Sequence, residues 1–188
     1  MDLELYQRIE NSSAHTQNRI DNGTFIVQNP HLLDDLITVS FNVNDKNHLR
    51  ACCILEKALE LQLDLVYPYL DSVCDKISSL KNDSAVRSIA RFIMLMVQDD
   101  TRKFNQNQNY LTENQLKKIT ENCFDWLISD LKIASKVYAI YTLYELGKTQ
   151  DWIYPELKII LEQDSSKYSA GYKAAARETL KKLRLHKL

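Results

Sequence analysis

Four basic residues that recur at regular distances constrain the fold more than any other feature of this sequence. Each begins a segment with helical periodicity and is followed three positions later by a small residue. The basic residues are Arg50, Arg87, Lys136 and Lys173, and the small ones are Cys53, Ala90, Ala139 and Ala176. The basic residues are 37, 49 and 37 positions apart, so that alternate ones are separated by 86. Such a period is typical of stacked helix pairs, in which no pair buries its apolar side alone, and it predicts an all-α fold.

Apolar residues repeat with a helical period wherever the pattern is clear. Leu70, Val73, Cys74 and Ile77, for example, all fall on one side of a helix. Start and stop residues then place four helix pairs: 30–42 with 46–61, 65–80 with 84–98, 113–129 with 132–147, and 154–163 with 169–185. We expect one further helix at the N-terminus to cover the exposed apolar end of the stack.

The repeat predicts a single domain spanning residues 1–188. Its expected parts are an N-terminal cap (1–28), the first two repeats (30–98), an inserted loop (99–112) and the last two repeats (113–188). The insertion, DDTRKFNQNQNYLT, is rich in Asn and Gln and lies where the spacing widens from 37 to 49. We expect it to be a long loop on the surface.

The segment from Asp83 to Ala90, DSAVRSIA, resembles the start of the second helix in a HEAT repeat. The resemblance implies a right-handed α-α superhelix, a HEAT/armadillo-like solenoid of about four helix pairs plus an N-terminal helix. It also implies a structural ladder in which aspartates and basic residues pair between repeats. The residues assigned to this ladder are Asp45, Arg50, Asp83, Arg87, Asp130, Lys136 and Lys173.

A second resemblance is carried by LTENQLKKIT (111–120), FDWLISD (124–130) and DWIYPELKII (151–160). These segments are similar to those of small bacterial HEAT-like proteins that are often labelled adenylosuccinate lyase. The label would suggest a regulator in purine biosynthesis. The serine loop of that lyase superfamily, Gly-Ser-Ser-x-Met-Pro-x-Lys-x-Asn, has no counterpart in this chain, so we do not expect lyase activity. None of the four histidines stands in the spacing of a nucleophilic or metal site, and we therefore expect no other enzymatic function.

Composition and charge narrow the classes of partner. Lys and Arg number 24 and Asp and Glu 25, which gives no general attraction to nucleic acid or to an anionic membrane. No apolar run is long enough to span a membrane, and the first residues do not resemble a signal peptide. The four cysteines form no C-x-x-C pair, which argues against zinc and disulfides. We expect a cytoplasmic protein without cofactor or metal.

Two features remain as candidate binding sites. The first is a basic C-terminal run, which consists of Lys167, Lys173, Arg177, Lys181, Lys182, Arg184, His186 and Lys187. The second is the aromatic connection at Trp152 and Tyr154. Both have a purely structural explanation, because basic residues favour a helix C-terminus and aromatic rings fill a core.

We interpret the chain as a non-catalytic protein-interaction or scaffold module whose partner is another protein. The residues assigned to partner binding are Trp152, Tyr154, Lys173, Arg177 and Lys181. The alternative is a nucleic-acid-binding or DNA-repair HEAT-like protein that uses the C-terminal basic helix. HEAT-like DNA glycosylases use tryptophan, aspartate and basic residues in a groove, and Trp126 and Asp130 fit that composition, but the nearly neutral charge disfavours a grip on duplex DNA.

Overall fold

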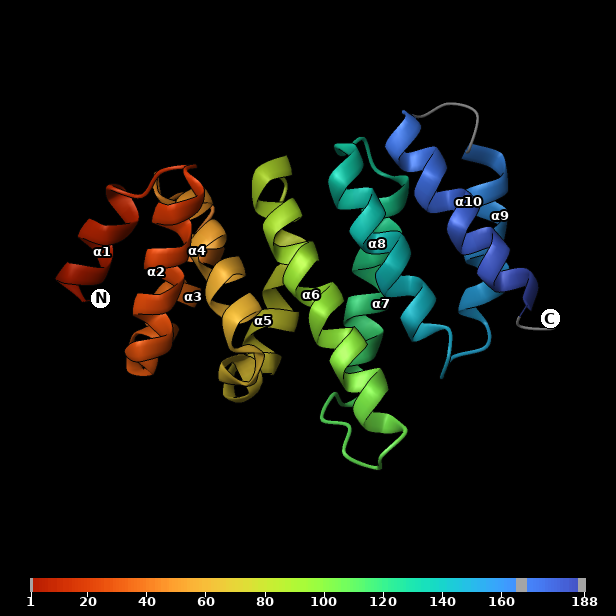
Figure 1. The fold of residues 1–188 in the computed structure, drawn as a ribbon, viewed down its shortest axis with the longest axis horizontal. Coiled ribbons are helices and arrows are strands. Elements are labelled where there is room, and N and C mark those ends of the chain that lie inside the picture. Colours follow the sequence, from red (N-terminus) through yellow and green to blue (C-terminus); the bar gives the residue numbers. More distant parts are fainter. Residues whose placement is uncertain (1, 165–168, 186–188) are drawn as a thin grey trace. The chain divides into compact units, whose positions relative to one another are not determined.

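The computed structural model describes residues 2–164 and 169–185, and all of the regular secondary structure in these ranges is helical (Figure 1). The all-α prediction is therefore confirmed. The chain divides into two compact units, Met1–Leu95 and Met96–Leu188. The helix α6 contributes residues to both units, because it runs from Asp83 to Phe104.

Within the described residues, the first unit consists of five complete α-helices and the first part of α6. They are α1 (Leu3–Glu10), α2 (Thr16–Gln28), α3 (Leu33–Phe41), α4 (His48–Leu61), α5 (Leu70–Lys76) and α6 (Asp83–Phe104). Short 3-10 turns at Pro30–Leu32, Leu63–Tyr69 and Ile77–Ser79 connect them. The helix α4 packs against α1, α2 and α3 and is central to this unit (Figure 1).

The N-terminal region differs from the single helix that we expected, because it forms two helices separated at residues 11–15. The first, α1, is capped at its N-terminus by Asp2, whose side chain accepts a hydrogen bond of 2.8 Å from the backbone N–H of Leu5. The second, α2, lies close against α4, since a Cβ atom on Gly23 would come within 2.8 Å of Lys57 Cγ. The buried residues of α2 are Asn22, Gly23 and Ile26, so only one of them is a large apolar residue. A search for apolar residues at helical spacing therefore gives a weak signal for this helix.

The second unit is formed by the end of α6 and four further helices. These are α7 (Glu113–Ile128), α8 (Ile133–Leu146), α9 (Ile153–Asp164) and α10 (Ala170–Leu185). The helix α8 packs against α7, α9 and α10 (Figure 1), in agreement with a sequence that is apolar on nearly every side. The start of α7 is defined by a capping box, in which Thr112 and Gln115 each bond the other's backbone N–H.

The inserted loop is shorter than the expected range 99–112, because α6 continues to Phe104. Within this extension Asp99 forms ion pairs with Arg102 and Lys103 one turn later, which favours a helix despite the polar composition. The helix then ends in a Schellman motif, with Asn107 at φ 57° and a hydrogen bond of 2.9 Å from Gln108 N to Lys103 O. Asparagine tolerates this left-handed conformation better than most residues do.

Candidate functional site

The four basic residues of the repeat occupy different environments. Arg50 is exposed and donates to the Asn47 side chain at 3.1 Å. Lys136 is 1% exposed and donates to the backbone oxygen of Leu127 at 3.0 Å, so it caps the C-terminal end of α7. Lys173 is exposed on α10. The shared spacing therefore does not correspond to a shared contact.

The aspartates assigned to the ladder also differ from one another. Asp45 accepts hydrogen bonds from the hydroxyl group of Tyr6 at 3.3 Å and from the backbone N–H of Asn47 at 2.7 Å. Asp83 is the first residue of α6, where a negative charge favours the helix dipole, and Asp130 is exposed in the turn after α7. Asp45 thus contacts α1, whereas Asp83 lies at the start of α6 and Asp130 lies after the end of α7.

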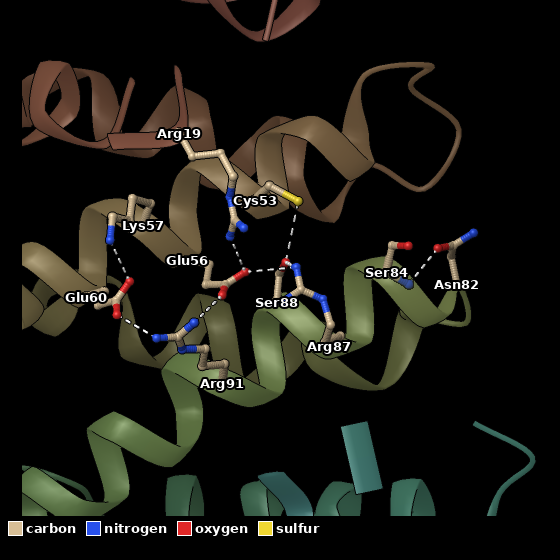
Figure 2. Close-up of polar contacts among 10 residues, drawn as sticks. All are labelled: Arg19, Cys53, Glu56, Lys57, Glu60, Asn82, Ser84, Arg87, Ser88 and Arg91. Atoms are coloured by element: carbon tan, nitrogen blue, oxygen red, sulfur yellow. Dashed lines mark hydrogen bonds and ion pairs between the residues drawn. The ribbon is translucent and has the colours of Figure 1, made fainter. Parts of the chain in front are cut away.

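Arg87 belongs to a cluster that sequence reasoning did not find, centred on the buried carboxylate of Glu56 in α4 (Figure 2). Three guanidinium groups point toward this carboxylate from α2 and α6. The distances to Glu56 oxygens are 3.2 Å for Arg19, 3.3 Å for Arg87 and 3.4 Å for Arg91. Glu56 is 1% exposed, whereas each arginine side chain remains between 29% and 32% exposed. One buried negative charge is thus shared by three partly hydrated positive charges.

Further contacts extend the Glu56 cluster along the same helices (Figure 2). Arg91 also reaches Glu60 at 2.5 Å, and Glu60 pairs with Lys57 at 3.0 Å. Arg87 donates to the Ser88 hydroxyl group at 3.2 Å. Since the charges of α2, α4 and α6 are joined around one carboxylate, we assign the cluster a structural role in the first unit.

A signal for Glu56 is present in the sequence. Cys52, Leu55, Glu56 and Leu59 lie at helical spacings of 0, 3, 4 and 7, which places Glu56 on the apolar side of α4. A charged residue on such a side is seldom buried without a partner. Its partners come from helices 31 to 37 residues away, and the sequence does not identify them.

A different arrangement of charge is found on α10. Its buried side carries Tyr172, Ala175, Ala176, Thr179 and Leu183, and its opposite side carries Lys173, Arg177, Lys181 and Arg184. The four basic residues are exposed and follow one another at steps of four, four and three positions, so they form a stripe along the helix. With Leu180 they line a shallow depression of about 430 Å³. We call Lys173, Arg177, Lys181 and Arg184 the α10 basic face.

The only acidic residue of α10 does not neutralise this face. Glu178 accepts a hydrogen bond of 2.7 Å from Lys182 and one of 3.4 Å from the hydroxyl group of Tyr141. The hydrogen bond from Lys182 holds the pKa of the Glu178 carboxyl below its usual value, and that of Lys182 is raised in return. Lys182 also lies over the ring of Tyr144, 5.5 Å from its centroid. Among the described residues the α10 basic face has no ion-pair partner; Lys167, His186 and Lys187 lie outside the described ranges.

The aromatic connection separates into one exposed and one buried residue. Trp152 is 55% exposed and stacks on Phe124, with ring centroids 5.9 Å apart. Tyr154, which we expected to contact a partner, is only 6% exposed and stacks on Tyr144 at 5.7 Å. Burial also raises the pKa of Tyr154. The prediction for Tyr154 is wrong because the first turn of α9 turns its ring inward against the end of α8, at Gly147.

None of the four cysteines, all of which lie in the described ranges, forms a disulfide: Cys52, Cys74 and Cys123 are buried, and Cys53 is partly exposed. Burial raises the pKa of Cys123 to about 12. Within residues 2–164 and 169–185, no group of three or more histidine, cysteine, aspartate or glutamate side chains is placed to hold a metal ion. In the same ranges no helix combines the length and the apolar character needed to cross a membrane.

The α10 basic face is therefore the site at which the predicted binding residues Lys173, Arg177 and Lys181 come together, with Arg184 as an additional member. Sequence reasoning had included Arg184 in the basic run without assigning it to the site. Comparisons of this chain with protein-family models, with curated proteins and with solved structures find no match.

Proposed function

We propose that this protein is a non-catalytic interaction module of the HEAT-like type, and that its α10 basic face binds an acidic segment of another protein. The observation that carries the proposal is the exposed stripe Lys173, Arg177, Lys181 and Arg184, which lacks acidic partners among the described residues. Like charges at successive helical turns destabilise a helix by a few tenths of a kcal/mol per pair. An acidic partner would relieve this repulsion.

The length and the charge of the face suit a short segment. Lys173 and Arg184 are eleven positions apart on the helix, which corresponds to roughly 16 Å at about 1.5 Å per residue. A peptide of a few acidic residues spans that distance. Since the whole chain has a net charge of −1, the residues outside the face carry net negative charge and would repel an extended polyanion. This balance favours an acidic protein segment over a nucleic acid.

The test is calorimetric titration of the protein with a ten-residue glutamate-rich peptide, at low and at physiological salt. We expect saturable binding that weakens with added salt, because exposed charges are screened. The triple variant K173E/R177E/K181E should lose this binding. A matched variant, K46E/K81E/K117E, changes the net charge by the same amount at exposed lysines of other elements and should retain it.

The alternative is that the α10 basic face binds nucleic acid instead of an acidic peptide. A single-stranded and a duplex oligonucleotide are titrated in parallel at about 50 mM salt, where phosphate contacts are strongest. Tighter binding of either oligonucleotide than of the acidic peptide, abolished by the same triple variant, would replace the proposal with the nucleic-acid alternative. Equal affinity of the two triple variants for the peptide would show that the α10 basic face is not the site.

A further inference from the structure

The second unit contains a cavity of about 440 Å³ that is separate from the α10 basic face. It lies where three segments meet: the last turns of α6, the loop 105–112 with the first turns of α7, and the end of α8. Its volume is in the range of cavities that bind small molecules or single side chains. None of its lining residues is basic, whereas two of them, Asp100 and Glu113, are acidic.

Asp100 is the most informative residue of this cavity. It is 5% exposed and lines the cavity wall. Its hydrogen bonds come from the backbone N–H groups of Tyr110 at 2.7 Å and Leu111 at 2.9 Å, and both are accepted by Oδ1. The second oxygen, Oδ2, has no donor among the described residues. Because Asp100 lines the cavity and Oδ2 is not among the fully buried atoms that lack a partner, this oxygen is free to accept a hydrogen bond from a ligand.

The bonds to Oδ1 also explain why Asp100 is held so firmly in place. They fasten the loop to α6, and the hydroxyl group of Tyr110 adds a hydrogen bond of 2.9 Å to the backbone oxygen of Met96. The adjacent Lys103 lies over the Tyr110 ring at 5.0 Å and pairs with Asp99 at 2.8 Å, and it is not among the residues that line the cavity. The position of the Asp100 carboxylate is therefore set before any ligand arrives.

Glu113 supplies a second carboxylate from the first turn of α7. It is exposed, and it has no hydrogen bond or ion pair among the described residues. The remaining wall joins apolar side chains, among them Phe104 and Leu146, to the polar groups of Thr149 and Gln150. The C-terminal ends of α6 and α8 add partial negative charge at the same place, while the positive end of α7 is offset by Glu113 itself.

We propose that this cavity binds a primary alkylammonium group, with the ammonium at Asp100 Oδ2 and Glu113 and the alkyl chain against Phe104, Leu111 and Leu146. A lysine side chain of a partner and a free aliphatic polyamine share this chemistry. An ammonium can donate to both carboxylates and to the side-chain oxygen of Gln150, whereas the apolar wall gives no favourable contact to a hydrated metal ion. The proposal stands on the cavity alone and does not depend on the function assigned to α10.

The direct test is a titration of the protein with n-hexylammonium chloride, followed by two-dimensional amide NMR. We expect saturable shifts at the backbone amides of Tyr110 and Leu111, because these groups bond the carboxylate that receives the ammonium. Hexanol has the same chain without the charge and should bind at least about tenfold more weakly, since a hydrogen bond to a charged group contributes more than one decade of affinity. Equal binding of hexanol would overturn the proposal.

Variants locate the binding group. In Asp100→Asn the side-chain oxygen can still accept from Tyr110 and Leu111, while the amide nitrogen would replace Oδ2 and repel an ammonium group. We expect n-hexylammonium affinity to fall at least about tenfold in this variant and to fall in Glu113→Gln, which removes only an exposed charge. The matched control is Glu121→Gln, which removes an exposed carboxylate of α7 that is absent from the cavity wall, and it should bind as the unaltered protein does. Unchanged affinity in both Asp100→Asn and Glu113→Gln would overturn the proposal.

The two natural sources of the group are distinguished by their shape. N-acetyl-lysinamide represents a lysine side chain of a partner, and spermidine represents a polyamine. Tighter binding of N-acetyl-lysinamide would identify a protein ligand, and tighter binding of spermidine would identify a small metabolite. Failure of all three ammonium compounds to give saturable shifts would overturn the proposal.

Discussion

Replacement of Glu56 by glutamine removes the negative charge on which Arg19, Arg87 and Arg91 converge. The three ion-pair distances, 3.2 to 3.4 Å, are longer than the ~2.7–2.9 Å of strong charge-assisted hydrogen bonds. We therefore assign each contact about 1 kcal/mol, the value for an ordinary hydrogen bond. Because the arginines retain roughly a third of their exposure, water screens much of their mutual repulsion after the substitution. The expected loss in the free energy of unfolding is about 3 kcal/mol.

Urea and thermal unfolding followed by far-ultraviolet circular dichroism measure this loss. About 3 kcal/mol corresponds to a fall of about 6–12 °C in Tm for a chain of this length. The matched control is Glu60→Gln, since Glu60 pairs with Arg91 and Lys57 but is 30% exposed, and we expect it to cost less than about 1 kcal/mol. If the free energies of unfolding of the two variants differ by less than about 0.5 kcal/mol, the buried ion pairs of Glu56 stabilise the protein no more than the exposed ones of Glu60, and the reasoning is refuted.

Two further substitutions and one pH series test the packing of the second unit. Gly147→Ala should destabilise the protein by about 1–3 kcal/mol in urea unfolding, because the added Cβ would lie 2.0 Å from the Tyr154 ring. The control is Gly171→Ala, whose Cβ would meet nothing closer than 3.8 Å, and it should be neutral or stabilise the protein by up to about 1 kcal/mol. An equal effect of the two changes would contradict this packing. Burial raises the pKa of Cys123 from 9.0 to about 12, so the folded state keeps a proton that the unfolded state loses. The stabilising contribution of Cys123 is thus present below pH 9 and declines between pH 9 and about 12. Across that range the urea midpoint should fall less in Cys123→Ala than in the unaltered protein. Identical slopes of urea midpoint against pH in the two proteins would refute the assignment.

Much of the helical structure could be predicted from the sequence because its signals are local. The pairs expected at 113–129 with 132–147 and at 154–163 with 169–185 match α7 to α10 within one residue at every end. Capping groups such as Thr112 and apolar spacings act within a few residues of the helix that they define. The right-handed superhelix and the HEAT-like classification stay predictions.

The sites were harder to predict because they depend on distant contacts. Lys173, Arg177 and Lys181 share a helix face, which a spacing of four residues predicts. The sequence pairs Tyr154 with Trp152 as a contact for a partner, whereas the burial of Tyr154 depends on the close approach of Gly147 in the preceding turn. Composition places Asp100 in a loop, whereas its position in the structure depends on a helix that continues past Asp99 and on amides ten and eleven residues away.

The positions of the two tryptophans have a consequence for optical measurements. The sequence contains two tryptophans, Trp126 and Trp152, and both lie in the unit Met96–Leu188. Intrinsic tryptophan emission therefore reports on that unit, while the unit Met1–Leu95 contributes only tyrosine. Since Trp126 is 4% exposed and Trp152 is 55% exposed, a collisional quencher such as acrylamide should separate their signals. The unaltered chain thus carries a spectroscopic label on one unit, and comparing its emission with the helical signal of the whole chain would show whether the two units unfold as one cooperative block.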